Sequence, residues 1–295
     1  MGAPRVVLVT RRTEYEELLD RHSTRGQAEF FLRSRGQELG PVLGRHEAFV
    51  SAVAAVEAAV PLDWRRARVE RAELARFVFE AGDIVVVLGQ DGLVANVAKY
   101  LDGQPVIGVD PVAGDGRGVL VPHEPAGVAD GLADIVSGHA AYIDRTMVRA
   151  TSDDGQILDA LNEIFVGQVG HQSARYLLSD GTGWERQSSS GVIVRTGTGG
   201  TGWCASLQRI MAPGMALPRP EERALSWFVR EAWPSSGTGV EHVVGLLGGG
   251  SGLELRCESD ELVAFGDGIE GDRLLIGWGQ SISVGVSPRI LRTLR

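Results

Sequence analysis

Apolar residues in the first half of the chain occur in short continuous runs that alternate with segments of helical spacing. Three runs are almost entirely apolar, as expected for strands buried on both faces of a parallel sheet: Val6–Thr10, Asp83–Leu88 and Pro105–Val109. Five other segments place apolar residues at helical spacing: Thr13–Leu19, Ala28–Ser34, His46–Val60, Ala72–Glu80 and Gly92–Leu101. This alternation predicts an α/β domain in which helices cover both faces of a parallel sheet.

The pattern changes after a predicted loop at Pro111–Gly118 and a predicted helix at Gly127–Met147. Short strand-like segments then follow one another, interrupted by one predicted helix at Cys204–Met211: Leu161–Val169, Ala174–Ser179, Gly191–Thr196, Val240–Leu247, Leu253–Cys257, Leu262–Phe265, Arg273–Ile276 and Ser281–Val286. We therefore predict an α/β domain over residues 1–125 and a β-rich domain over 126–270. We expect the segment 271–295 to return to the first domain.

Size and charge limit the classes of function. The chain has 295 residues, of which 43% are hydrophobic, enough for one large domain or two ordinary ones with a buried core. Its net charge of −9 argues against a general nucleic-acid-binding surface. The apolar stretch Phe49–Leu62 contains Glu57 and is shorter than the ~20 residues of a membrane-spanning helix. We expect neither nucleic acid nor a membrane as a partner.

The cysteines and the N-terminal residues indicate a reduced, cytoplasmic protein. Cys204 and Cys257 are the only cysteines, and the sequence has no C-x-x-C or H-E-x-x-H motif, so we expect no disulfide framework and no protein metal centre. The first apolar run is closed by Arg11 and Arg12, which predicts a buried strand rather than a signal peptide.

A glycine turn, Gly89–Leu93 (GQDGL), lies between a predicted strand and a predicted helix. Such a turn exposes N–H groups that bind phosphate, and the helix dipole favours the anion. Asp91 lies at the carboxyl end of the strand, where α/β sheets place ligands, and can accept a proton from an attacking hydroxyl. The alternative is a simple turn in which Asp91 caps the helix.

A second glycine-rich loop, Thr196–Trp203 (TGTGGTGW), also follows a predicted strand and precedes a helix. Its hydroxyls and glycines fit a polar ligand loop, and Trp203 either offers a face for base stacking or packs in the core. Three of its glycines match G-x-G-x-x-G: Gly197, Gly199 and Gly202. The loop lies in the β-rich half rather than in the first βαβ unit, which disfavours a Rossmann dinucleotide site.

Asn162 and Glu163 open a predicted strand of the second domain. An asparagine side chain both donates and accepts hydrogen bonds, which suits a ribose diol, and a glutamate accepts a hydroxyl hydrogen bond or helps to hold Mg²⁺. The plainer interpretation of this pair is two polar residues at the end of a helix. His171 has no predicted partner, so a structural role is favoured over that of a general base.

These pieces, in this order, resemble the NAD kinase family. That family carries GGDGT after a central strand of its first domain, then an Asn-Glu pair, then GDGLIVSTPTGSTAY. Here Leu88–Leu93 reads LGQDGL, Ala160–Ile164 reads ALNEI and Ser190–Trp203 reads SGVIVRTGTGGTGW. The resemblance covers residues 83–290. Diacylglycerol and sphingosine kinases share the GGDGT theme, but the Asn-Glu pair and the second loop favour the NAD kinase branch.

The resemblance implies a two-domain fold and transfer of the γ-phosphoryl of ATP, with Mg²⁺, to the 2′-hydroxyl of the adenosine ribose of NAD(H). Asp91 matches the catalytic base, and the matching phosphate-loop positions are Gly89, Gln90, Gly92 and Leu93. The substrate-binding positions that it implies are Asn162, Glu163, Ser190, Thr198, Thr201, Gly202, Trp203 and Ser206. It also implies a homodimer or homotetramer whose partner is a small nucleotide substrate.

Several positions depart from the family motifs. Gln90 replaces a glycine and Leu93 a threonine of GGDGT, Ser190 replaces the aspartate of GDGL, and Gly197 replaces the proline. The catalytic aspartate remains while groups around it change. A kinase for a different nucleotide, nucleoside or sugar, and an inactive nucleotide-binding protein, are therefore the alternatives. Because Lys99 is the only lysine and no Walker A loop exists, phosphate charge must be met by Mg²⁺ and arginine.

Overall fold

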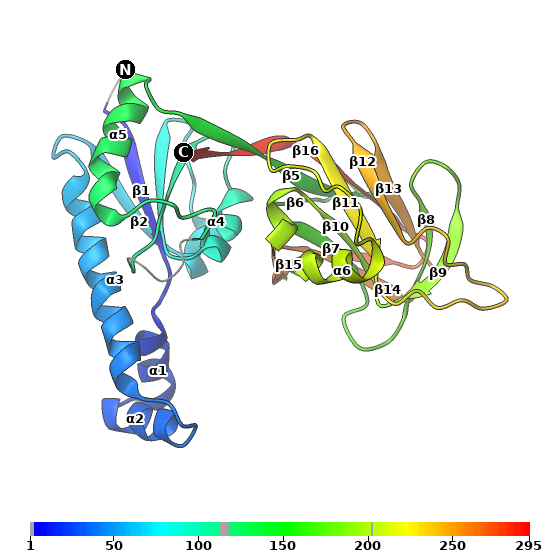
Figure 1. The fold of residues 1–295 in the computed structure, drawn as a ribbon, viewed down its shortest axis with the longest axis horizontal. Coiled ribbons are helices and arrows are strands. Elements are labelled where there is room, and N and C mark those ends of the chain that lie inside the picture. The colour runs from blue at the N-terminus through cyan, green and yellow to red at the C-terminus, as the bar shows by residue number, and fades with distance from the viewer. Residues whose placement is uncertain (1–2, 113–117, 202) are drawn as a thin grey trace. The chain divides into compact units, whose positions relative to one another are not determined.

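The computed structural model describes residues 3–112, 118–201 and 203–295, and only the backbone at Thr201 and Trp203. The chain divides into two compact units. Unit 1 comprises Met1–Ile143 with Arg292–Arg295, and unit 2 comprises Asp144–Leu291. Figure 1 labels most of their helices and strands. Our sequence boundary at residue 125 therefore lies inside unit 1, and only the last four residues, rather than 271–295, return to that unit.

Unit 1 is built on a parallel sheet in the order β2-β1-β3-β4, extended by the end of β16. The strands are β1 (Arg5–Thr10), β2 (Arg65–Glu70), β3 (Asp83–Leu88), β4 (Pro105–Val109) and β16 (Ser281–Leu294). Every residue of β3 is buried, as its continuous apolar run predicts for a central strand. The chain passes from β1 to β2 on one side and to β3 on the other, so β1 and β3 flank the point where the strand order reverses.

Helices cover both faces of this sheet (Figure 1). On one face, α3 (Leu39–Ala59) and α5 (Val128–Ser137) pack against alternate strand residues such as Leu8 and Val86. On the other face lies α4 (Asp91–Ala98), which follows β3. The predicted α/β architecture of the first part of the chain is thereby confirmed.

Two short helices pack against the N-terminal part of α3 in a small separate core. They are α1 (Glu14–His22) and α2 (Arg25–Arg33). A capping box starts α1, because Thr13 and Glu16 hydrogen-bond each other's backbone N–H groups. The predicted helices in this region are confirmed, with α3 seven residues longer at its start than expected.

One predicted helix is too long, and another is only a 3-10 turn. In place of a helix over Gly127–Met147, the structure has a 3-10 turn η2 (Pro125–Gly127), then α5, and then β5 (Tyr142–Ser152). The helix stops because Gly138 adopts a left-handed conformation with φ 75°. In place of the helix over Ala72–Glu80 there is only η1 (Arg71–Arg76), after which the chain turns into β3.

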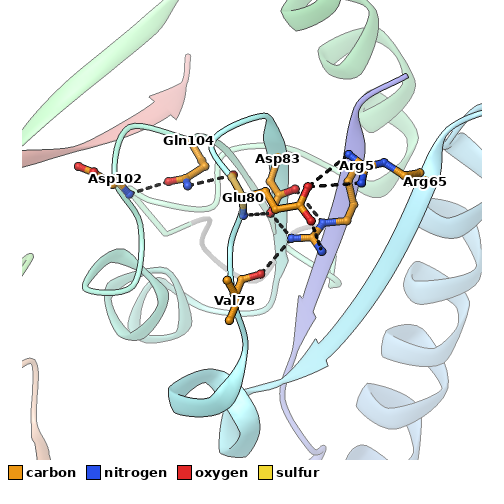
Figure 2. A network of polar contacts seen from close by, with 7 residues as sticks. All are labelled: Arg5, Arg65, Val78, Glu80, Asp83, Asp102 and Gln104. Atoms are coloured by element: carbon orange, nitrogen blue, oxygen red, sulfur yellow. Dashed lines mark hydrogen bonds and ion pairs between the residues drawn. The ribbon is translucent and has the colours of Figure 1, made fainter. Parts of the chain in front are cut away.

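The amino ends of β1 and β3 are joined by a buried ion pair (Figure 2). Arg5 donates to the two carboxylate oxygens of Asp83 at 2.8 and 2.7 Å, and to the carbonyl of Val78 at 3.0 Å. Asp83 is 1% exposed and also accepts the N–H of Glu80. The polar groups at the amino ends of these strands are therefore hydrogen-bonded to one another.

Unit 2 contains two layers of strands around one core. One layer is a six-stranded antiparallel sheet in the order β12-β11-β10-β7-β14-β15. Its strands are β7 (Glu163–Gly167), β10 (Val192–Arg195), β11 (Ala224–Val229), β12 (Val244–Gly248), β14 (Glu261–Gly266) and β15 (Ile269–Gly277). The other layer comprises β5, β6 (Ile157–Ala160), β8 (Ala174–Ser179), β9 (Glu185–Ser189), β13 (Gly252–Cys257) and β16. The predicted β-rich character of this part is confirmed.

The six-stranded sheet is also covered on its second face. The 3-10 turn η3 (Thr198–Thr201) leads into α6 (Trp203–Met211). Buried Cys204 of α6 packs with Phe165 of β7 and Ile193 of β10. Among the described residues, no helix is long and apolar enough to cross a membrane.

Candidate functional site

Asp91 is the first residue of α4, directly after the turn that leaves β3. Its two carboxylate oxygens accept the N–H groups of Val119 and Leu120, both at 2.9 Å. A Cβ at Gly118 would collide with a carboxylate oxygen of Asp91, so any side chain there would displace the carboxylate. The carboxylate therefore points to this loop and does not cap its own helix, which answers the alternative that we considered from the sequence.

The residues around Asp91 differ in exposure. Gln90 and Gly92 are exposed, whereas Leu93 is 3% exposed and packs against Gly89. The N–H of Gly89 donates to the carbonyl of Val109 at 2.9 Å, which ties the turn to the end of β4. Gln90 is thus placed to meet a ligand, while Leu93 belongs to the core of unit 1.

A cavity of 220 Å³ lies beside this turn, within unit 1. It is lined by the segments that follow β1, β3 and β4 and by one stretch of α3. These are the carboxyl ends of the strands around the point where the strand order reverses, the usual ligand position in such sheets. The lining residues include Arg11, Arg12, Thr13, Glu14, Val42, Arg45, His46, Phe49, Gly89 and Gln90.

Three arginines and one carboxylate make this cavity cationic. Arg12 pairs with Asp20 on α1, and Arg45 pairs with Glu14 at 2.6 Å. Arg11 is exposed and makes no hydrogen bond or ion pair to any other residue that the structure describes. Sequence reasoning took Arg11 and Arg12 only as the end of a strand. The available signal was the arginine pair directly after a parallel strand.

Asn162 and Glu163 lie where the chain enters β7 in unit 2. The carboxylate of Asp267 accepts the backbone N–H groups of Leu161 at 2.8 Å and Asn162 at 2.7 Å. Asp267 itself has a left-handed φ of 52° in the turn between β14 and β15. It anchors the Asn-Glu segment from a distant part of the sequence, and our motif analysis gave it no role.

Glu163 lies in an unusual electrostatic environment. Burial, and secondly the negative charge of Asp267, raise its pKa to about 7, and the positive charge of Arg195 opposes this rise. Its carboxyl group has no hydrogen-bond partner among the residues that the structure describes. A carboxyl group whose pKa lies near 7 is typical of functional sites.

The second glycine loop packs directly on the Asn-Glu segment. The Thr196 hydroxyl donates to the carbonyl of Leu161 at 2.6 Å. A Cβ on Gly199 would collide with the backbone of Asn162, and one on Gly197 with the backbone of Arg219. Close backbone contact, in an antiparallel sheet, explains these glycines, so the Rossmann alternative has no structural support.

The other predicted substrate-binding residues do not all lie near the Asn-Glu segment. Ser190 precedes β10, at the end of that strand opposite to Arg195, so it is not brought to the Asn-Glu segment. Thr198 is in η3, and Ser206 is exposed on α6. Gly202 and the side chains of Thr201 and Trp203 lie outside the described residues. His171 is exposed in the loop before β8, in line with the absence of a predicted partner.

No three His, Cys, Asp or Glu side chains of the described residues lie close enough together to hold a metal ion. Mg²⁺ is commonly bound by one or two carboxylates together with substrate phosphates and water. Asp110 directly follows β4, at the same edge as Asp91. The residues present therefore fit Mg²⁺ only when a phosphate ligand shares it.

Comparison with known proteins finds several relatives that are named NAD kinase. The chain is 31% identical over 131 residues to the NAD kinase of Clostridium tetani, covering 42% of this chain and 47% of that protein. It is 33% identical over 135 residues to the NAD kinase of Ralstonia nicotianae, covering 42% of this chain and 43% of that protein.

A longer match is found with NAD kinase 2, mitochondrial, of Rattus norvegicus. It is 25% identical over 260 residues and covers 70% of this chain and 61% of that protein. No protein-family model matches the chain. The chain spans about half the length of the bacterial relatives that it matches. The resemblance to the NAD kinase family that the motifs predict is confirmed by these relatives.

Proposed function

We propose that the chain is an ATP- and Mg²⁺-dependent phosphotransferase that phosphorylates a ribose hydroxyl of NAD(H) to give NADP(H). The observation that carries this proposal is the position of Asp91 on a turn whose neighbours Gly89 and Gln90 also line a cationic cavity. A base next to an anion site is the arrangement that phosphoryl transfer requires. The kinase names of the relatives support the same chemistry.

The cavity of unit 1 is assigned to the phosphates of the donor. Its volume of 220 Å³ is below the roughly 300–1,000 Å³ of sites that enclose whole ligands, so it suits a phosphate tail. Arg11 and Arg45 would neutralise the phosphate oxygens, in place of the lysine of a Walker A loop. When bound, Mg²⁺ supplies further charge neutralisation, with Asp110 and the phosphates as its ligands.

Asp91 is assigned as the proton acceptor. A carboxylate offers about four lone-pair positions, and the two N–H donors of Val119 and Leu120 fill two of them. They fix the orientation of the carboxylate and leave acceptor positions for the substrate hydroxyl, which must come within about 3 Å.

Unit 2 is assigned to the acceptor nucleotide. Asn162 and Glu163 would bind the ribose, and the glycine loop 196–200 would lie beside it. Phosphorus NMR with ATP, Mg²⁺ and a panel of NAD, NADH, nucleosides and sugars tests the assignment. We expect a new phosphomonoester signal with NAD or NADH. A signal with another acceptor only would instead support the alternative function, a kinase for a different nucleotide, nucleoside or sugar.

A second candidate is a nucleotide-binding protein without catalysis. It is favoured by the exposed side chain of Gln90, which occupies a position where the family turn has glycine and backbone meets phosphate. Calorimetry would then show NAD or ATP binding without any transfer, and turnover on any acceptor excludes it. On the family resemblance alone we also propose a homodimer or homotetramer, and on the cysteine usage we propose a cytoplasmic location.

A further inference from the structure

A buried arginine that the family motif does not contain lies at the end of β10. Arg195 is fully buried, with 0% of its surface exposed, and its Nε donates to the Ser226 hydroxyl at 2.9 Å. Its Nη1 is buried and has no hydrogen-bond partner among the described residues. A buried donor without a partner is costly, and in a native protein it commonly marks the place of a ligand or bound water.

The space for this side chain is provided by a second change in the same motif. Arg195 and Gly200 both occupy positions where the family motif GDGLIVSTPTGSTAY has serine. A Cβ on Gly200 would lie 3.3 Å from Arg195 Nη1, tighter than most side-chain contacts. The guanidinium therefore lies directly beneath the glycine loop, and the two departures fit together physically.

The neighbours of Arg195 place it in the Asn-Glu site. Arg195 pairs with Glu163 across β10 and β7, so both side chains project from the same face of the sheet. No ion pair within 4 Å links them among the described residues, so the guanidinium is not neutralised by direct contact. The third ionisable neighbour, Cys204, stays neutral, since burial raises its pKa to about 12.

We infer that Arg195 is a ligand-binding residue of unit 2 and that its free Nη1–H donates to a phosphate oxygen of the bound nucleotide. This inference rests on the proposed function, which makes the ligand a nucleotide. Phosphate is the anionic group that nucleotides carry, and guanidinium–phosphate hydrogen bonds are about twice as strong as neutral ones. The serine of the family motif would supply only a neutral donor at the same position.

Glu163 links this binding to protonation. A phosphate held by Arg195 brings negative charge close to Glu163, whose neighbourhood already contains Asp267. Binding therefore favours the protonated form of Glu163, and protons are taken up when the pH is near or above its pKa of about 7. Affinity for NAD is expected to rise as the pH falls from 8.5 to 6.5.

Calorimetry without ATP tests the inference, with NAD, NADP and adenosine as probes. The variant R195S/G200S restores the two serines of the family motif and removes the buried charge. We expect it to bind NAD, NADP or both at least tenfold more weakly than the unchanged chain and to bind adenosine equally well. Both dinucleotides contain the bridging phosphates, but only NADP carries a further phosphate on the ribose. A loss for both therefore indicates that Arg195 binds the bridging phosphates, and a loss for NADP alone indicates the ribose phosphate. The matched control R256S replaces an exposed arginine of unit 2 and should change nothing.

Equal affinity of the variant for both dinucleotides would overturn the inference, as would an equal loss for adenosine, which would indicate a structural role. If the variant does not fold, the pH profile of the unchanged chain decides. A flat NAD affinity between pH 8.5 and 6.5, or a slope that persists in E163Q, contradicts the inference. If phosphate transfer is absent but Arg195-dependent binding remains, only the proposed kinase activity fails.

Discussion

The two candidate regions hold their carboxyl groups in opposite ways. In unit 1, half-buried Asp91 accepts two backbone N–H groups and lies beside a cationic cavity. In unit 2, Glu163 is largely buried, has no hydrogen-bond donor among the described residues, and has a pKa raised to about 7. In the proposed function, the first arrangement orients Asp91 for proton transfer, and the second makes the charge of Glu163 respond to a bound ligand.

The contrast extends to the arginines. Those at the amino edge and in the cavity of unit 1 mostly have carboxylate partners, such as Arg5 with Asp83 and Arg45 with Glu14. Among the described residues, Arg195 of unit 2 has a hydroxyl group as its one hydrogen-bond partner, and its Nη1 has none. In the proposed function, this difference assigns the highly charged donor to unit 1 and a ligand that supplies the missing hydrogen-bond acceptor to unit 2.

The largest effect is expected for D91N. Loss of the proton-accepting carboxylate should lower kcat by about 10²–10⁴-fold, the usual contribution of general base catalysis. The melting temperature should fall by a few degrees, because the amide NH2 replaces one of the two acceptor oxygens and one backbone N–H loses its partner. Steady-state kinetics with ATP and NAD measure the effect, and full turnover by this variant would remove Asp91 from its proposed role.

The next largest effect is expected for G118A. The added methyl group would collide with the Asp91 carboxylate and turn it away from its N–H donors. We expect kcat to fall by about 10–100-fold, as for a misplaced catalytic group. The control G26A adds a methyl group where no atom lies within 4 Å and should leave kcat unchanged. Equal kcat in the two variants would argue against an oriented Asp91.

A smaller effect is expected for the double variant R11Q/R45Q in the cavity of unit 1. Loss of two charged hydrogen bonds to phosphate should raise the KM for ATP by about 10–100-fold, with the KM for NAD unchanged. The control R33Q removes an exposed arginine of α2 that pairs with Glu29. A rise in the KM for NAD instead would place the acceptor, not the donor, in this cavity.

The smallest effect concerns the stability of E163Q. Because the folded-state pKa of Glu163 is raised, its stabilising contribution is present below about pH 4.5 and is lost as the pH rises to about 7. At pH 8 the ionised, buried carboxylate opposes folding, so E163Q should melt a few degrees higher than the unchanged chain. Near pH 4.5 the difference should vanish. A constant difference at both pH values would argue against the raised pKa.

Much of unit 1 could be predicted from the sequence, because continuous apolar runs and helical spacing are strong local signals. The run DIVVVL became the fully buried strand β3, and the turn after it carries Asp91 as expected. The edge strand β2 was missed, because its residues RRARVE alternate around the single buried Val69 and read as a charged surface. The helix expected over Gly127–Met147 is shorter than predicted, because Gly138 ends α5.

The candidate sites were less predictable, since they depend on residues far apart in the chain. Arg45 reaches the cavity of unit 1 from α3, and Asp267 anchors the Asn-Glu segment from more than 100 residues away. The Arg45 contact has no local sequence signal, and the resemblance of VAFGDG at Val263–Gly268 to a late Asp-Gly region of the family does not predict the contact that Asp267 makes. Arg195 did have one, because a lone arginine closes an apolar strand at a position where the family motif has serine.

The most direct measurement of the central claim is phosphorus NMR of ATP, Mg²⁺ and NAD with the unchanged chain and with D91N in parallel. The account predicts a phosphomonoester signal and ADP with the unchanged chain, and a rate at least a hundredfold lower with D91N, whose NAD binding is preserved. Equal rates for the two proteins, or no transfer to any ribose hydroxyl by the unchanged chain, would contradict it.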